Sequence, residues 1–481
     1  MTGNFNRNKD TKAIETILKA PQSSFFYVRG RRRVGKSWIL KKIAKKHKNV
    51  FYYMGAQDLK TSGAFTDFIL EWENFSKQKK LSEINPVLLS WKRIFDEITL
   101  YIKTSKTQTV LIFDEIQWIA KAGSGSGFIG KLKEAWIDLE KTDKAKVVIC
   151  GSSYKFFQEN TGGEEVILRG MKTHSDILVQ PLSLSQCRKE YFTSWNLHET
   201  TIAYMMTGGV PYYLKQIDPR KAFISAINDA FFCKNTIFTA EVDEVLRLEF
   251  NRQGIKTVKV ILEAIGTYGA TQVTIIKKTK ISDATVSEIL TKLEDYAIVD
   301  GHTPSGSPTK ANRSGVKYYI KDFYLNTYFS LLAPLQEKII KNNSALIFSN
   351  EYLKDFSSYY IENYTGPMFE KVIRYILELR LLEVNLFKKL DLRDENYRVT
   401  QFWDRNQQVD IIIEHPRDRI SRAIEVKWVN KKTNNLAHLY NALEEKDYPL
   451  PKNFSRRNYL ALSLETQKQS DAFQILLPDL F

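Results

Sequence analysis

One stretch near the N-terminus combines the residue types that bind the phosphate groups of a nucleotide. It fits the pattern G-x-x-x-x-G-K-[ST] and runs Gly30-Arg31-Arg32-Arg33-Val34-Gly35-Lys36-Ser37. Glycine lets the backbone turn tightly, so that successive N–H groups converge on phosphate oxygens. The Lys36 ammonium can reach the β- and γ-phosphates, and the Ser37 hydroxyl can ligate magnesium. The stretch therefore predicts a binding site for ATP and Mg²⁺.

Two acidic residues follow an apolar run further along the chain. Residues 110–113, Val-Leu-Ile-Phe, lead directly into Asp114 and Glu115, as a buried parallel strand does when its end enters a site. We expect Asp114 to hold the magnesium ion and Glu115 to act as general base on the attacking water. Taken without the phosphate loop, the same motif could also be a strand that ends in two acidic residues exposed to solvent. Ser152, which follows the predicted strand at 146–151, is interpreted as a γ-phosphate sensor, a helix N-cap, or both.

A third set of reactive residues lies near the C-terminus, where Asp410 belongs to one apolar run and Glu425 and Lys427 to the next. Period-2 alternation places Glu425 and Lys427 on one face of a strand, with room for Asp410 beside them. Two carboxylates can bind a divalent metal, and a lysine can lower the pKa of an attacking water. Glu370, on an upstream helix, could supply a third acid. An ordinary hairpin with a surface Glu/Lys pair is the alternative.

The elements that must position the first two sets alternate between strand and helix. Strands are predicted near 25–29, 49–54, 108–113, 146–151 and 176–180, and helices near 11–19, 37–47, 63–77, 88–104, 128–140 and 183–192. This alternation predicts a parallel sheet covered by helices on both faces, with ligands at the carboxyl ends of the strands. Further along, residues 208–214 (Gly-Gly-Val-Pro-Tyr-Tyr-Leu) look like a hinge in a helical lid.

Residues 245–320 show the pattern of a winged helix-turn-helix. Helices are expected over 258–265, around 274–276 and from Ser282 onward, followed by strands at 298–299 and 317–320 with a loop between them. The third helix would present polar side chains to DNA, namely Thr285, Ser287, Glu288 and Lys292. Winged helices also dock proteins, so both DNA and a partner protein remain open as ligands.

Composition sets the outer limits. The 481 residues predict about three domains, and 43% hydrophobic residues are enough for proper cores. No apolar run approaches the roughly 20 residues that span a bilayer, and three widely spaced cysteines favour a reducing cytoplasm. The net charge is +16, and residues 1–50 hold 14 basic and 2 acidic residues. This positive charge has two interpretations. It attracts DNA, or it provides a positive electrostatic potential at the nucleotide site, next to a basic helix that faces solvent.

Taken together, four motifs resemble those of the archaeal-type ATPases, an AAA+-like branch of P-loop NTPases. They are the arginine-rich phosphate loop, the FDEIQW run at 113–118, the GSS at 151–153 and the GGVPYYL run, and the resemblance covers about residues 10–240. It implies an ATP-dependent switch or motor with Lys36, Ser37, Asp114 and Glu115 in the roles given above. Such proteins often carry an arginine that could contact a neighbour's nucleotide, and here it is shifted within residues 168–172, Leu-Arg-Gly-Met-Lys. This shift argues against hydrolysis across subunits, while a homo-oligomer stays open as an assembly.

The C-terminal segment resembles the PD-(D/E)XK nuclease fold and the domain often attached to these ATPases. The resemblance implies catalytic roles for Glu370, Asp410, Glu425 and Lys427, with Asp410 and Glu425 as metal ligands. The resulting α/β prediction has five parts, which are a P-loop ATPase core (1–180), a helical lid (181–244), a winged helix (245–325), a helical linker (326–350) and a restriction-endonuclease-like domain (351–481). We expect a cytoplasmic ATPase acting on DNA. The alternatives are a nucleotide-switched DNA-binding regulator and a protein-docking scaffold, neither with cleavage.

Overall fold

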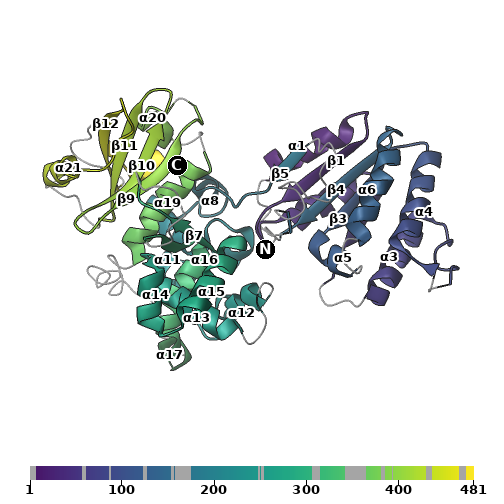
Figure 1. Cartoon of the computed structure of the whole chain (residues 1–481), viewed down its shortest axis with the longest axis horizontal. Coiled ribbons are helices and arrows are strands. Elements are labelled where there is room, and N and C mark those ends of the chain that lie inside the picture. The colour runs from purple at the N-terminus through teal and green to yellow at the C-terminus, as the bar shows by residue number, and fades with distance from the viewer. Residues whose placement is uncertain are drawn as a thin grey trace. The chain divides into compact units, whose positions relative to one another are not determined.

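The computed structural model describes residues 7–56, 61–85, 88–122, 127–152, 156–157, 175–247, 250, 254–305, 315–341, 364–380, 385–392, 394–429, 436–464 and 473–481. Residues 4–181 form one compact unit, and residues 182–481 belong to a second (Figure 1). Within the described ranges, no helix combines the length and apolar character that crossing a bilayer requires.

The first unit is built on a five-stranded parallel sheet. Its order is β2-β3-β4-β1-β5, and every neighbouring pair of strands is parallel. The strands are β1 (Ser24–Arg29), β2 (Val50–Met54), β3 (Thr109–Asp114), β4 (Ala145–Gly151) and β5 (Ser175–Leu178). All five predicted strands are present within two residues of their expected ends, and the expectation of a parallel α/β sheet is confirmed.

Helices cover both faces of this sheet because consecutive residues of the central strands are apolar, so that both faces must be buried. One core packs the sheet against α1 (Asn8–Lys19) and α2 (Lys36–Lys46), through residues such as Phe26 and Ile112. The other is rich in aromatic rings and includes Phe25 and Phe113. It lies beneath α3 (Thr61–Ser76), α4 (Trp91–Thr104), α5 (Ile116–Ala122) and α6 (Gly127–Glu140). Among the described residues of this unit, the short helix α5 and the helical residues 156–157 were not predicted.

The second unit begins with a helical segment. Its elements are α8 (Leu184–Glu190), α9 (Leu197–Thr207), α10 (Pro211–Leu214), α11 (Phe223–Ile227), η2 (Asn228–Phe232) and α12 (Ile237–Arg247). Gly208 and Gly209, the predicted hinge, both have positive φ and connect α9 to α10. A Cβ atom on Gly209 would lie 2.0 Å from the carbonyl oxygen of Leu182. The two glycines therefore form a tightly packed turn that only glycine fits.

A three-helix segment follows, over residues 254–320. It contains α13 (Gly254–Ile265), α14 (Gln272–Thr279), α15 (Asp283–Asp295) and an antiparallel sheet of β6 (Ala270–Thr271), β7 (Val299–His302) and β8 (Lys317–Ile320) in the order β6-β8-β7. Ser282 caps α15 by accepting a hydrogen bond from the Thr285 N–H. Beyond it lie α16 (Phe323–Thr327), η3 (Tyr328–Leu332) and α17 (Ala333–Lys341).

We call residues 364–481 the C-terminal domain. It has a mixed sheet in the order β13-β12-β11-β10-β9. Strands β9 to β11 are antiparallel, and β12 pairs parallel to β11. The elements are α19 (Gly366–Glu378), α20 (Asn385–Lys389), β9 (Arg398–Trp403), β10 (Gln408–His415), β11 (Ile420–Lys427), α21 (Leu436–Glu444), β12 (Ser455–Leu462), β13 (Gln474–Ile475) and η5 (Leu477–Leu480). The three-helix segment touches edge strand β9, where the Ser305 N–H donates to the Gln401 carbonyl at 2.8 Å.

Candidate nucleotide site and C-terminal acidic site

The predicted phosphate loop leaves the carboxyl end of β1 and enters α2. Two glycines take backbone conformations that other residues rarely adopt, with φ of +152° at Gly30 and +101° at Gly35. A Cβ atom on Gly30 would lie 2.2 Å from the Val179 carbonyl oxygen. The glycines of the motif are therefore required by the fold of the loop as well as by access to phosphate. The arginines at 31–33 are half-buried, and Val34 is buried.

Lys36 is folded back onto its own loop. Its ammonium donates to the carbonyl oxygens of Gly30 at 2.9 Å and of Arg31 at 3.0 Å, and the residue is 4% exposed. Burial lowers the pKa of Lys36, although Cys150, Glu115 and Asp114 nearby favour its charged form. The lysine thus lies close enough to Asp114 and Glu115 for their charges to stabilise its ammonium.

Arg7 fixes the loop from outside the motif. Its guanidinium donates to the Val34 carbonyl at 2.7 Å and to the Gln180 carbonyl at 2.6 Å, and the residue is 7% exposed. Arg7 therefore joins the phosphate loop to the segment after β5. No sequence pattern marks this role, because the contact spans distant parts of the chain.

Asp114 lies at the end of β3 and is fully buried. Its Oδ2 atom accepts a hydrogen bond from the Tyr52 hydroxyl at 2.5 Å, and its Oδ1 atom accepts one from the Glu115 N–H at 2.9 Å. Burial, and then the charge of Asp114, raise the pKa of Tyr52, so that the phenol remains a donor. Tyr52 comes from the neighbouring strand β2. Its contact with Asp114 could therefore be predicted only by knowing the strand order.

Glu115 takes a left-handed backbone conformation, with φ of +51°, which is uncommon for residues other than glycine. Its carboxylate accepts hydrogen bonds from the Ser152 hydroxyl at 3.2 Å and from the Gln117 side-chain amide. A Cβ atom on Gly151 would lie 2.7 Å from the Gln117 side-chain oxygen, so the glycine allows this close approach. The structure thus brings Ser152 to the acidic pair. Ser153 and residues 168–172 lie outside the described residues.

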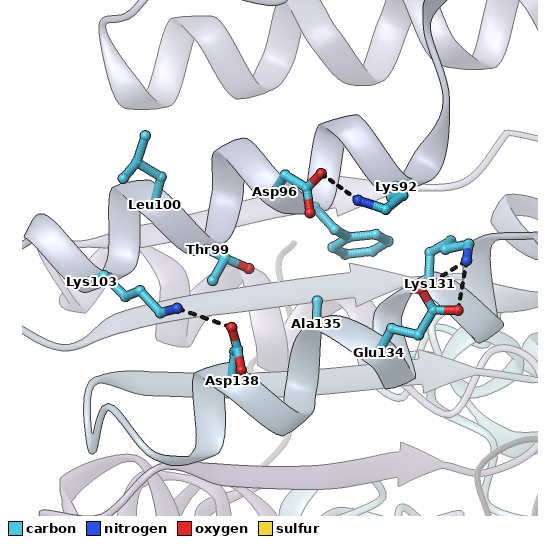
Figure 2. A pocket seen from close by; sticks show the side chains of 10 residues that line it. Lys92, Asp96, Thr99, Leu100, Lys103, Lys131, Glu134, Ala135 and Asp138 are labelled. Atoms are coloured by element: carbon cyan, nitrogen blue, oxygen red, sulfur yellow. Dashed lines mark hydrogen bonds and ion pairs between the residues drawn. The ribbon is translucent and has the colours of Figure 1, made fainter.

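A separate groove of about 360 Å³ lies between α4 and α6 (Figure 2). Ion pairs run along it, such as Lys103 with Asp138 at 3.0 Å and Lys92 with Asp96 at 3.1 Å. Its lining contains no residue of the phosphate loop or of the acidic pair. This charged groove is therefore not part of the candidate nucleotide site.

In the C-terminal domain, Asp410 and Glu425 meet on adjacent strands and are each 8% exposed. Asp410 accepts hydrogen bonds from the Val426 N–H at 2.9 Å and from the Gln408 side-chain amide at 3.0 Å. Glu425 forms ion pairs with Lys427 at 2.8 Å and with Lys446 at 2.6 Å. The predicted triplet therefore converges, with Lys446 from beyond α21 as a partner that the sequence did not reveal.

Glu370, on α19, lines the same cleft as Asp410 and Glu425. It pairs with Arg374 at 2.6 Å, and Arg374 also donates to the Asp410 carbonyl at 2.7 Å. Burial, and then the charge of Asp410, raise the pKa of Glu370 to about 8, while burial and Glu425 raise that of Asp410. These residues line a cleft of about 720 Å³. In the described residues, no three His, Cys, Asp or Glu side chains are grouped so as to hold a metal ion, so Glu370 does not form a three-acid ligand set with the other two.

The first unit thus has the fold and the site of a P-loop nucleotide-binding domain, with a phosphate loop and an acidic pair at the carboxyl ends of a parallel sheet. Residues 5–217 match the family model of an ATPase domain predominantly from Archaea. The protein therefore contains an ATPase domain and is an ATP hydrolase. Residues 328–439 match a model of archaeal and bacterial proteins of unknown function.

Similar proteins extend over most of the chain. An uncharacterized protein of Methanocaldococcus jannaschii is 24% identical over 444 residues, which is 92% of this chain and 91% of the relative. A Walker-type ATPase of Pyrococcus abyssi is 18% identical with a TM-score of 0.49, and the match covers 68% of this chain and 95% of that one. The ORC2 protein of Aeropyrum pernix is 12% identical with a TM-score of 0.37, and the match covers 70% and 95%.

Proposed function

We propose that this protein couples ATP turnover in its first unit to metal-dependent cleavage of DNA by its C-terminal domain. One observation carries the proposal, which is that Glu370, Asp410, Glu425 and Lys427 meet at one cleft. They do so in a domain in which α19 and the short α20 are followed by three antiparallel strands, α21 and the parallel strand β12. That order of elements and acids is the one expected for a PD-(D/E)XK nuclease-like domain.

In the nucleotide site, the loop N–H groups and Lys36 hold the phosphates of ATP, and Ser37 and Asp114 hold Mg²⁺. The donor set fits this ion, because a hydroxyl and a carboxylate are oxygen ligands. Glu115 accepts the proton of the attacking water. Ser152 orients Glu115 through the hydrogen bond at 3.2 Å and is close enough to the acidic pair to report the state of the γ-phosphate.

In the C-terminal cleft, Asp410 and Glu425 hold a divalent cation. The donors fit such an ion, because two carboxylates approach from adjacent strands and the cleft is open to substrate. When bound, the cation would polarise a phosphate and favour hydroxide over water. Lys427 stabilises negative charge at the reacting phosphate, and Glu370 orients Arg374 against the strand that carries Asp410.

The three-helix segment fits a DNA-binding role as a winged helix. Helix α15 begins at a serine cap and exposes Glu288 and Lys292, which form an ion pair at 2.6 Å. Thr285 and Ser287 on the same helix are half-buried. A partner protein, or a second copy of the chain, is the alternative ligand of this surface.

A cleavage assay tests the proposal. Purified protein is incubated with plasmid and with linear DNA, in the presence of ATP and either Mg²⁺ or Mn²⁺, and the products are separated on a gel. Asp410→Asn should abolish cleavage. Glu395→Gln removes an exposed carboxylate of the same domain, outside the cleft, and should cleave like the parent. Intact DNA with the parent protein under every condition would refute the nuclease role.

A second candidate function is a nucleotide-switched DNA binder without cleavage. The observation that favours it is the pairing of both Glu425 oxygens with lysines, Lys427 and Lys446. Such pairing neutralises a carboxylate that a metal would otherwise use. Under this alternative the assay yields no products, while the affinity for DNA changes with bound ATP.

A further inference from the structure

A second cavity lies next to the acidic cleft, between the three-helix segment and the C-terminal domain. Its volume is about 320 Å³, within the range of sites for small ligands. The two cavities are contiguous, because four residues line both of them. These shared residues are Tyr268, Pro367, Glu370 and Gln408. We call this second cavity the interdomain pocket.

The interdomain pocket and the acidic cleft have opposite charge balances. Four lysine or arginine side chains line the pocket against three acidic ones, whereas four acidic side chains line the cleft against two lysines. Three of the four basic groups are engaged. Lys321 pairs with Asp300 at 3.1 Å, Arg374 pairs with Glu370, and Lys371 donates to the Ile320 carbonyl at 2.8 Å.

Lys317 differs from the other three basic residues. It lies on β8, is half-buried, and its ammonium is 5.3 Å from the centre of the Tyr319 ring. In the part of the chain that the structure describes, this ammonium forms neither a hydrogen bond nor an ion pair. Burial lowers its pKa, whereas the charge of Glu370 favours the protonated form. A partly desolvated cation that forms no hydrogen bond or ion pair can still accept an external anion.

We propose that the interdomain pocket binds the phosphate monoester of a nucleotide, with Lys317 as its cationic ligand. Tyr268 is 48% exposed where the pocket meets the cleft, so its ring can stack on the base. The nucleotide is either the phosphorylated end of a DNA strand or a free mononucleotide. The choice of a nucleotide rests on the proposed function, because the adjacent cleft would process phosphodiesters. A strand end in the pocket would extend into the acidic cleft.

Binding is measured in full-length Lys36→Ala protein, which removes the phosphate-loop lysine, and in EDTA, which prevents cleavage. The probes are fluorescent single-stranded oligonucleotides with a 5′-phosphate, with a 3′-phosphate or with neither, and dAMP by calorimetry. At least one phosphorylated strand, or dAMP, should bind, and Lys317→Ala should weaken that binding by about tenfold or more. The strand probes and dAMP distinguish the two sources of the phosphate.

Two variants provide controls. Lys317→Arg keeps the charge and should retain most of the affinity, and Lys256→Ala removes an exposed lysine of α13 outside both cavities and should bind like the parent. Thermal melting establishes that Lys317→Ala is folded. The proposal is wrong if folded Lys317→Ala binds every probe as its parent does. Loss of cleavage in Asp410→Asn with unchanged phosphate binding would separate this pocket from the nuclease role, and intact DNA with Lys317-dependent binding would support the pocket alone.

Discussion

The two acidic sites of this molecule place carboxylates at similar points of buried strands but surround them differently. Asp114 and Glu115 receive hydrogen bonds from uncharged groups, chiefly Tyr52, Gln117 and Ser152. Glu425, by contrast, pairs with two lysines, and Glu370 pairs with an arginine. The charge of the first pair remains available to a cation, whereas that of the second is largely balanced from within. We infer that the carboxylates of the first site can accept a cation directly, while those of the second must first give up their ion pairs.

The largest effect is expected at the phosphate loop, which tests the first half of this comparison. Lys36→Ala should lower ATP turnover on the order of 100-fold or more, because the cation that can reach the β- and γ-phosphates is lost. Turnover is followed by phosphate release. Lys45→Ala, an exposed lysine of the same helix, serves as the control and should turn over ATP like the parent. Unchanged turnover in Lys36→Ala would remove the loop from catalysis.

Glu115→Gln should separate binding from chemistry. The amide keeps the size of the side chain but cannot accept the proton of the water, so turnover should fall by roughly 10²–10⁴ while ATP still binds. Single-turnover hydrolysis and nucleotide binding are measured on the same preparation. Hydrolysis at the parent rate would show that another group acts as the base.

Titration of Glu370 sharpens the second half of the comparison. Burial raises the pKa of this carboxyl to about 8 in the folded protein, from an ordinary value of 4.5. The folded state therefore binds this proton more tightly, and its stability falls as the pH rises from about 4.5 to about 8. Relative to the parent, Glu370→Gln should therefore become more stable as the pH rises over this range. Each kcal/mol of difference in the free energy of unfolding should raise the melting temperature by roughly 2–4 °C. Melting curves at pH 5 and pH 8 measure the difference, and an equal difference at both values would contradict the raised pKa.

The smallest effect is expected for Tyr52→Phe. Removing the hydroxyl takes one hydrogen bond from Asp114 and leaves the ring packing intact, so ATP turnover should fall by about three- to tenfold. The concentration of Mg²⁺ that gives half-maximal turnover should rise. A variant with the parent's Mg²⁺ dependence would show that Asp114 is held mainly by the Glu115 N–H.

Short-range patterns predicted much of this molecule. The phosphate loop, the apolar run before Asp114 and the alternation of β11 are local signals, and the structure has the corresponding elements in place. Contacts that depend on strand order or chain reversal could not be predicted in this way. Arg7 on the loop, Tyr52 beside Asp114 and Lys446 beside Glu425 are all of that kind.

The contact of Ser305 with strand β9 has a consequence for solubility. Strand β9 is the last in its sheet, and an exposed edge offers unpaired backbone groups to strands of other molecules. The hydrogen bond from the Ser305 N–H to the Gln401 carbonyl occupies one of those groups from outside the sheet. A shortened chain that starts at residue 364 would lose this cover, and its sheets would be free to join edge to edge into aggregates.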